Sequence, residues 1–334
     1  MNPALLELRG LCVDFATGGH VSRAVDSIDL CIAKGDAIGL VGESGSGKSV
    51  TWLAALGLLP SRACVTGQAL LNGEDLVDAP RTRLEAIRGR RIAMIFQDPA
   101  SCLNPVHRIG RQVEEAVRLH RGSEGPSARS EAQRLLDQVG IADPRRRLDD
   151  YPHQLSGGMN QRVMIAIALA GQPDLLIADE PTTALDATIQ AQILRLLAEI
   201  RRDTGMAMVL ISHDLGVVSE NVDRVCVMYA GRIVEDAPSD TLFAAPRHPY
   251  TQGLLSALPS LIGPRERLAA IPGTVPEPWN LPAGCSFAPR CPAAAPHCHH
   301  ERPDRVAVAV DHGVACSRVT ALDQPLWERQ KAVA

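Results

Sequence analysis

Eight consecutive residues have the types and spacing that bind the phosphates of a nucleotide. They read G-x-x-x-x-G-K-S and comprise Gly42, Glu43, Ser44, Gly45, Ser46, Gly47, Lys48 and Ser49. In such a loop the backbone N–H groups surround the phosphates, and the helix that follows adds the positive end of its dipole. We expect Lys48 to reach the β- and γ-phosphates and the Ser49 hydroxyl to be a Mg²⁺ ligand.

Polar side chains follow three other apolar stretches that read as buried strands. Asp179 and Glu180 come directly after Leu175–Ala178, Gln97 follows a second such stretch, and His213 follows a third. Asp179 is predicted to hold Mg²⁺, and Glu180 to act as the general base that polarises the attacking water. Gln97 is predicted to contact the Mg²⁺–water shell, and His213 to hydrogen-bond the γ-phosphate. The alternative is that both are structural residues.

A second stretch, Leu155–Gln161, reads L-S-G-G-M-N-Q and predicts another anion-binding helix N-terminus. Ser156 is placed to cap the helix, while Gly157 and Gly158 leave its first amides accessible. One nucleotide does not require two anion-binding helix N-termini on the same chain. We therefore interpret Ser156, Gly157, Gly158 and Gln161 as completing the nucleotide site of a second subunit, with ordinary helix capping as the alternative.

The elements expected to position these residues alternate between strands and helices, which favours an α/β fold with a parallel sheet. Apolar strands are predicted at 37–41, 92–96, 175–178 and 207–211, and helices at 50–59, 159–170 and 189–204. Strands at 5–15, 25–32 and 67–72 are expected to form an antiparallel layer, with a turn at Gly18-Gly19. Helices within 108–139, with a loop at 122–130, indicate a helical insertion. Phe15 is either a platform for the adenine ring or an ordinary core aromatic.

Net charge and apolar content limit the partners and the cellular compartment that we expect for the chain. The 334 residues carry a net charge of −4, which gives no bulk attraction to nucleic acid. No apolar run approaches the ~20 residues of a membrane span, and the apolar start is interrupted by Glu7 and Arg9, unlike a signal peptide. We expect a cytosolic protein whose membrane spans, if it needs them, belong to other chains.

The C-terminal part has a different character. Ten of the 24 prolines lie between Pro259 and Pro303, which excludes long helices and central strands there. Four of the nine cysteines follow a C-x5-C-x6-C-x17-C spacing: Cys285, Cys291, Cys298 and Cys316. Their wide spacing favours a [4Fe–4S] cluster over zinc, which prefers tight pairs, although His297, His299 and His300 keep zinc open. Free thiols or a disulfide are the remaining alternatives.

Together these motifs resemble the nucleotide-binding subunit of an ABC transporter over residues 5–250. The resemblance places the Walker A loop at Gly42–Ser49, the Walker B strand at Leu175–Glu180 and the signature sequence at Leu155–Gln161. It also places the Q-loop at Gln97, the D-loop at Ala184-Leu185-Asp186 and the switch histidine at His213. It implies an ABC-type P-loop NTPase with a mixed sheet, an antiparallel β subdomain and a helical insertion at about 100–170. It also implies ATP and Mg²⁺ as cofactors.

A narrower resemblance is to the ATPases of dipeptide and oligopeptide importers. It rests on Phe96–Pro99 with Leu103–Pro105, on Arg247–Thr251, and on the tail Gly284–Pro292. It implies a nucleotide-binding domain at 1–250 and a small Pro/Cys-rich extension at 251–334, in whose counterparts a [4Fe–4S] cluster is expected. It further implies a second homologous ATPase, commonly in a heterodimer, two transmembrane permeases, and indirectly an extracytoplasmic peptide-binding protein.

The chain is thus expected to power peptide import as a peripheral protein on the cytoplasmic face of the inner membrane. Close relatives of such importers carry nickel or glutathione, so the solute does not follow from the ATPase. The alternative from another class is a soluble ABC ATPase acting on DNA, ribosomes or cluster assembly. Against it, the chain has one cassette, lacks a long heptad-rich insertion and carries the proline–cysteine tail.

Overall fold

The computed structural model describes residues 4–17, 20–183, 185–257, 266–267, 271–319, 326–327 and 330–331. The predicted Gly18-Gly19 turn, Ala184 of the predicted D-loop and the stretch around Pro259 lie outside the described residues. The chain forms two compact units. The first comprises Met1–Leu6, Ile32–Ala37 and Asp78–Ile211, and the second comprises Glu7–Cys31, Ile38–Val77 and Ser212–Ala334.

The first unit is built on three parallel strands in the order β8, β7, β6. These strands span Ala207–Ser212, Leu175–Asp179 and Ile92–Ile95. Every residue of β7 and β8 is buried, as expected for a parallel sheet that is covered on both faces. The register pairs Asp179 with Ile211, so β7 and β8 end at the same edge of the sheet.

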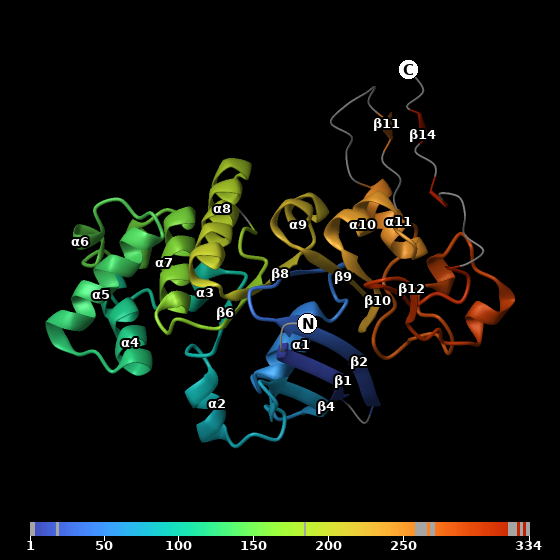
Figure 1. Cartoon of the computed structure of the whole chain (residues 1–334), viewed down its shortest axis with the longest axis horizontal. Helices are drawn as coiled ribbons and strands as arrows, with labels where there is room; N and C mark the ends of the chain where they lie inside the picture. Colours follow the sequence, from blue (N-terminus) through green and yellow to red (C-terminus); the bar gives the residue numbers. More distant parts are fainter. Residues whose placement is uncertain are drawn as a thin grey trace. The chain divides into compact units, whose positions relative to one another are not determined.

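Helices make up the rest of the first unit. They are α2 (Arg81–Ile87), α3 (Pro99–Cys102), α4 (Ile109–Arg121), α5 (Gly125–Gln138), α6 (Pro144–Arg147), η1 (Pro152–Gln154), α7 (Gly157–Leu169) and α8 (Ala187–Thr204). Figure 1 shows α4, α5 and α7 side by side, and these three pack on one another. The helical insertion predicted for about 100–170 therefore corresponds to the segment from α3 to α7. One detail of that prediction was wrong, because α5 already begins at Gly125, inside the loop expected at 122–130.

The second unit contains two sheets. One has four strands in the order β2-β1-β4-β5, with β4 antiparallel to β5. It contains the three strands predicted as an antiparallel layer, and each of them is longer than expected. The other, in the order β12-β13-β10-β9-β3, is mixed, since β3 pairs with β9 in parallel while β10 is antiparallel to both β9 and β13. Strands β9 and β10 form an antiparallel hairpin, and the predicted mixed sheet is confirmed.

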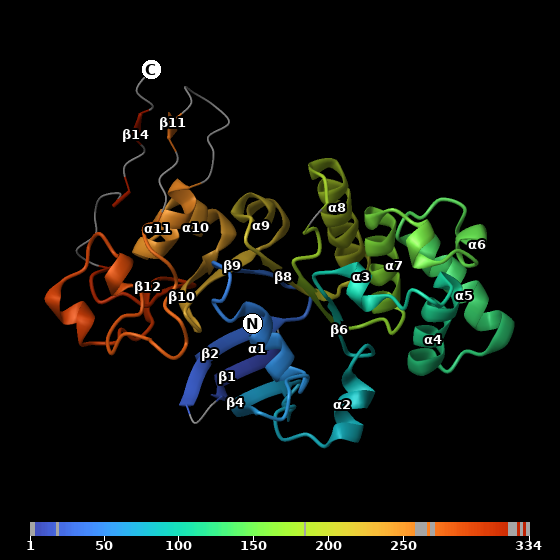
Figure 2. The same ribbon diagram turned by 180° about the vertical axis from the view of Figure 1, so that it is seen from behind.

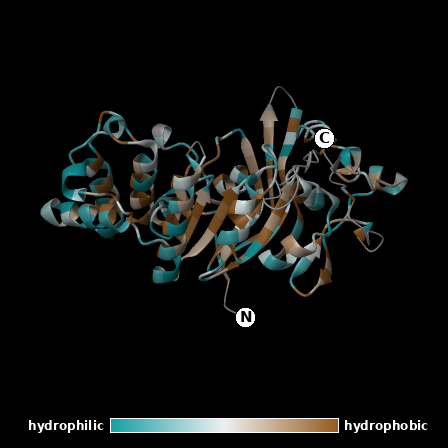
Figure 3. Cartoon of the chain, turned by 90° about the horizontal axis from the view of Figure 1, so that it is seen from above, coloured by the Kyte–Doolittle hydropathy of each residue, from teal (hydrophilic) through white to brown (hydrophobic). Residues whose placement is uncertain are grey.

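The strands and helices of the second unit have the following bounds. The strands are β1 (Ala4–Thr17), β2 (His20–Ala33), β3 (Ala37–Val41), β4 (Ala63–Leu71), β5 (Glu74–Asp75), β9 (Arg224–Tyr229), β10 (Arg232–Pro238), β11 (Glu266–Arg267), β12 (Val306–Ala309), β13 (His312–Val314) and β14 (Gln330–Lys331). The helices are α1 (Lys48–Ala55), α9 (Leu215–Asn221), α10 (Ser239–Ala244), α11 (Pro249–Ser256), η2 (Ala288–Arg290) and η3 (Pro296–His299). Figure 2 shows the same elements from behind, and Figure 3 shows hydrophobic residues, in brown, concentrated in the strands near the centre of the view.

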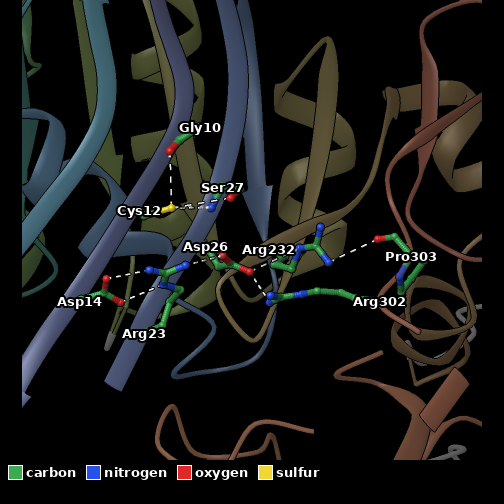
Figure 4. Close-up of polar contacts among 9 residues, drawn as sticks. All are labelled: Gly10, Cys12, Asp14, Arg23, Asp26, Ser27, Arg232, Arg302 and Pro303. Atoms are coloured by element: carbon green, nitrogen blue, oxygen red, sulfur yellow. Dashed lines mark hydrogen bonds and ion pairs between the residues drawn. The ribbon is translucent and has the colours of Figure 1, made fainter. Parts of the chain in front are cut away.

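Among its described residues, the proline-rich stretch contains the short 3₁₀ helices η2 and η3 and the two-residue strand β11, in agreement with the prediction from its prolines. Strands β12 and β13 follow it. We call residues 271–319 the cysteine lobe. One attachment of this lobe is the buried carboxylate of Asp26 on β2, which lies between three arginines (Figure 4). Asp26 forms ion pairs with Arg302 of the lobe, with Arg232 at 3.7 Å and with Arg23 at 3.4 Å. An ion pair therefore joins the lobe to strand β2 of its own unit.

Candidate nucleotide site and cysteine lobe

The predicted phosphate loop lies in the second unit, between the buried strand β3 and helix α1. The Lys48 ammonium donates to Gly42 O at 2.7 Å, to Glu43 O at 2.9 Å and to Ser46 Oγ at 3.3 Å. Its positive charge is thus held inside the loop, where phosphate oxygens are expected. Ser44 and Gly45 are exposed at the tip, and Ser49 lies in the first turn of α1.

Two glycines of the loop are required by close backbone contacts. A Cβ on Gly42 would lie 2.1 Å from Met228 O on β9, and a Cβ on Gly47 would lie 2.7 Å from Ala24 O. Gly47 also has a φ of 98° and caps the N-terminus of α1 in a left-handed conformation. The glycine spacing therefore reflects packing as well as room for a ligand.

The predicted catalytic carboxylates lie in the first unit at the end of β7. Asp179 is buried as the last residue of the strand, and Glu180 follows it with a φ of 47°, a left-handed conformation that is rare for residues other than glycine. Glu180 Oε2 accepts hydrogen bonds from Gln97 Nε2 at 2.8 Å and from Thr183 Oγ1 at 2.9 Å. The structure thus brings Gln97 and Glu180 together, and Thr183 is a contact that the sequence analysis did not predict.

The predicted signature residues lie at the N-terminus of α7, also in the first unit. Ser156 caps this helix by accepting a hydrogen bond from Met159 N at 3.3 Å, as predicted. Gly158 has a packing role as well, because a Cβ there would lie 2.7 Å from Ile189 Cγ2 on α8. Gln161 is buried, and its Nε2 has no hydrogen-bond partner among the described residues. Asp186 caps α8, accepting from Ile189 N at 2.9 Å.

The remaining predicted nucleotide contacts belong to the second unit. Phe15 lies half-buried on β1, and His213 is exposed directly after β8. Asp214 caps α9 through bonds from Gly216 N and Val217 N, which fixes the chain just beyond His213. The phosphate loop, Phe15 and His213 are thus residues of the second unit. Gln97, Asp179, Glu180 and the signature residues are residues of the first.

The four C-terminal cysteines line one cavity with a volume of about 20 Å³. Burial raises the pKa of Cys285 and Cys316, and it raises the pKa of Cys291 to about 12. Cys285 and Cys298 are also joined through their backbones, by a bond from Cys285 N to Cys298 O at 2.9 Å. All four are free thiols, so the disulfide alternative is wrong for this structure. Among the described residues, no group of three or more His, Cys, Asp or Glu side chains is arranged to hold a metal ion.

Two side chains that the sequence analysis did not single out contact the phosphate loop. Arg290 of the cysteine lobe forms an ion pair with Glu43, and the Tyr250 hydroxyl accepts from Glu43 N. Both residues lie in segments on which the importer resemblance rests, Tyr250 in 247–251 and Arg290 in 284–292. That resemblance was the one sequence signal that could have identified them. No helix within the described ranges is both long and apolar enough to cross a membrane.

Known proteins are similar to this chain in fold and in sequence. A family model described as ABC transporter matches residues 25–183, and one described as oligopeptide/dipeptide transporter, C-terminal region, matches residues 234–298. A dimeric ATP-binding cassette in a post-hydrolysis state, bound to ADP and Pi, has a TM-score of 0.63 at 27% identity, covering 70% of this chain and 98% of that chain. The cbiO1 protein of Clostridium perfringens, from an ABC transporter complex, has a TM-score of 0.62 at 27% identity, covering 73% and 92%.

Full-length relatives are more similar still. A putative peptide import ATP-binding protein of Brucella abortus is 55% identical over 90% of this chain and 90% of its own length. The dipeptide transport ATP-binding protein DppD of Escherichia coli is 50% identical over 90% of this chain and 92% of its own length. The resemblance inferred from the motifs is thereby confirmed, together with the fold that it implies. The chain belongs to the family of ABC transporter ATPases, in the group that carries the oligopeptide/dipeptide transporter C-terminal region.

Proposed function

We propose that this chain hydrolyses ATP to power the import of dipeptides or oligopeptides across the cytoplasmic membrane. The observation that carries the proposal is the match to the oligopeptide/dipeptide transporter C-terminal region, because that region lies outside the general ATPase cassette. The names of the Brucella and Escherichia coli relatives, which refer to peptide import and dipeptide transport, support it. We further propose that the chain works as a peripheral protein on the cytoplasmic face of that membrane.

The proposed mechanism gives each predicted residue a role in ATP hydrolysis. Lys48 and the amides of Gly42–Ser49 bind the phosphates, and Phe15 stacks on the adenine ring. Glu180 takes a proton from the attacking water, while Gln97 orients Glu180 through their hydrogen bond. His213 hydrogen-bonds the γ-phosphate.

A magnesium ion is the cofactor that this chemistry requires. The donors fit a hard cation, since Ser49, Gln97 and Asp179 all offer oxygen atoms. When bound, Mg²⁺ supplies positive charge to the β- and γ-phosphate oxygens.

We propose that two such ATPases form a head-to-tail dimer in which each signature segment completes the partner's site. The dimeric cassette among the structural relatives supports this arrangement. Ser156, Gly157, Gly158 and Gln161 would then face the second nucleotide, and Asp186 would lie beside them. We propose that the second ATPase is a different, homologous chain, which makes the dimer a heterodimer. The other proposed partners are two permeases and, indirectly, a peptide-binding protein.

Purification of the tagged chain from membranes tests this proposal. We expect two polytopic permeases to be recovered with the chain, and we expect dipeptides with their binding protein to stimulate the ATPase activity of the complex. Nickel and glutathione serve as matched solutes. Stimulation by either of them without any response to dipeptides would contradict peptide import, and recovery with ribosomes or DNA would contradict the transport role.

We also propose that the cysteine lobe binds a metal group through Cys285, Cys291, Cys298 and Cys316. Four thiols on one cavity support this, since thiolates bind both zinc and iron–sulfur clusters. A cavity of about 20 Å³ has room for a single ion or water molecule, so a [4Fe–4S] cluster requires the lobe to widen. For Zn²⁺ as well as for the cluster, the four side chains must turn toward one another, because they are not arranged to hold a metal ion as they stand. In either case the bound group would stabilise the fold of the lobe by joining the four cysteines.

Metal analysis of anaerobically purified protein decides between these groups. A broad absorption band near 400 nm, as iron–sulfur clusters show, with about four irons per chain is expected for the cluster. A colourless protein with about one zinc per chain would identify zinc instead. The variant in which Ser replaces all four cysteines is the control, and equal metal content in this variant and in the wild type would contradict binding at the lobe.

A further inference from the structure

Glu43, the second residue of the phosphate loop, is held on three sides by hydrogen bonds. Its N–H donates to the Tyr250 hydroxyl at 2.9 Å, and its carbonyl accepts from Lys48 Nζ at 2.9 Å. Its carboxylate accepts two bonds from Arg290, from Nη1 at 2.6 Å and from Nη2 at 2.9 Å. Lys48 belongs to the loop itself, whereas Tyr250 and Arg290 come from the C-terminal part of the same unit.

Arg290 is itself fixed by its surroundings. Its side chain is only 5% exposed, whereas that of Glu43 is 31% exposed, so Arg290 is anchored in the lobe and reaches out to the loop. The guanidinium also donates to Pro272 O at 2.8 Å and to the Tyr229 hydroxyl at 3.3 Å. A planar guanidinium with several of its donors engaged holds a carboxylate in one orientation, which a flexible ammonium does not.

An aromatic cluster connects the turn that carries Arg290 to strand β9 and helix α11. Phe287 packs on Tyr229 and Tyr250, with ring centroids 5.2 Å and 5.4 Å apart. Phe287 directly precedes η2, the single turn that ends in Arg290, and η2 lies between Cys285 and Cys291 in the sequence. Packing of this kind fixes the position of the turn, and therefore the position of the guanidinium, relative to the phosphate loop.

We propose that Arg290 is a positioning residue for the phosphate loop, and that through Glu43 the cysteine lobe sets the affinity of the loop for nucleotide phosphates. The Lys48 ammonium donates a hydrogen bond to the backbone carbonyl of Glu43. A shift of Glu43 therefore moves a hydrogen-bond acceptor of Lys48, the residue that is expected to bind the phosphates. This inference rests on the proposed phosphate-binding role of the loop. Arg290 touches no reacting group, so its effect on the reaction is indirect.

Equilibrium binding of Mg²⁺-ATP to the full-length chain tests the inference. We expect Arg290→Gln and Glu43→Gln each to weaken binding about tenfold, which corresponds to about 1.4 kcal/mol. We expect the double variant to bind no more weakly than either single variant, since both changes remove the same ion pair. Arg290→Lys is expected to recover part of the lost affinity. In steady-state assays the KM for ATP is expected to rise with little change in kcat.

Arg302→Gln is the matched control, because Arg302 joins the same lobe to Asp26 and not to the loop (Figure 4). We expect it to leave ATP affinity within about twofold of the wild type. If Arg290→Gln and Arg302→Gln weaken binding equally, or if Arg290→Gln has no effect, the positioning role is overturned. Lys48→Ala separates this failure from a failure of the proposed function. If Lys48→Ala binds ATP as tightly as the wild type, the phosphate-binding role itself is wrong.

Discussion

Replacing Glu180 with glutamine is expected to lower ATP turnover by about 10²- to 10⁴-fold while ATP binding is retained. The range is the contribution that a positioned general base makes to a reaction rate. Glutamine has the same shape as glutamate, and its amide oxygen still accepts hydrogen bonds from Gln97 and Thr183. It cannot take a proton from water at neutral pH. Phosphate release and ATP affinity, measured on the same preparation, check the two halves of this expectation.

A matched control is available in the same unit. Glu199 is exposed on α8, and Glu199→Gln makes the same chemical change away from the end of β7. We expect wild-type turnover in this variant. Turnover near the wild-type rate in Glu180→Gln would remove Glu180 from the base role, and the residue would then be a structural turn residue with a left-handed backbone.

The sequence predicts those parts of the site whose geometry is local. A buried strand, a glycine-rich loop and a helix in succession fix the position of Lys48, because its ammonium bonds to residues only two to six positions away. The same holds for Ser156, whose hydroxyl accepts a hydrogen bond from Met159 N, three residues ahead. The hydrogen bond of Gln97 to Glu180 spans 83 residues, yet it follows from two strand ends that meet at one edge of a parallel sheet.

Helix ends were predicted less well, for identifiable reasons. The segment 122–130 is rich in Gly, Ser and Pro, which favoured a loop. In the structure Gly122 ends α4 in a left-handed conformation, and Pro126 stands in the first turn of α5, where a proline is well tolerated. Helix α1 ends at Ala55, ahead of the predicted stop at Pro60, and Gly57 adopts a left-handed φ just beyond it.

Contacts between distant segments without a sheet to align them could not be predicted. Arg290 and Glu43 are 247 residues apart, and neither residue type is unusual in its surroundings. The cysteine spacing predicted that the four thiols belong together, and they do line one cavity. The spacing did not reveal that the turn between the first two cysteines carries the arginine that reaches the phosphate loop.

A second set of long-range contacts surrounds the buried carboxylate of Glu235 on β10. Glu235 is fully buried, and it accepts hydrogen bonds from Arg247 N at 2.7 Å and from His248 N at 2.9 Å. His312 Nε2, on β13, lies 2.8 Å from its Oε1. Burial disfavours the charged form of Glu235, but the bonds from His312, Arg247 and His248 outweigh burial and lower the pKa of the carboxyl below its ordinary value.

Glu235→Gln is expected to lower the free energy of unfolding by about 3 kcal/mol at pH 7, because its amide group presents a donor to a site built from donors. A carboxyl with a lowered folded-state pKa stabilises the fold above its unfolded pKa of about 4.3, and this stabilisation is lost as the pH falls through the folded-state value. The difference between wild type and variant should therefore shrink below about pH 4. Denaturant unfolding at pH 7 and at pH 3.5 measures this, with Glu301→Gln, at an exposed position in the cysteine lobe, as the control. An equal difference at both pH values would show that the charge of Glu235 does not stabilise the fold.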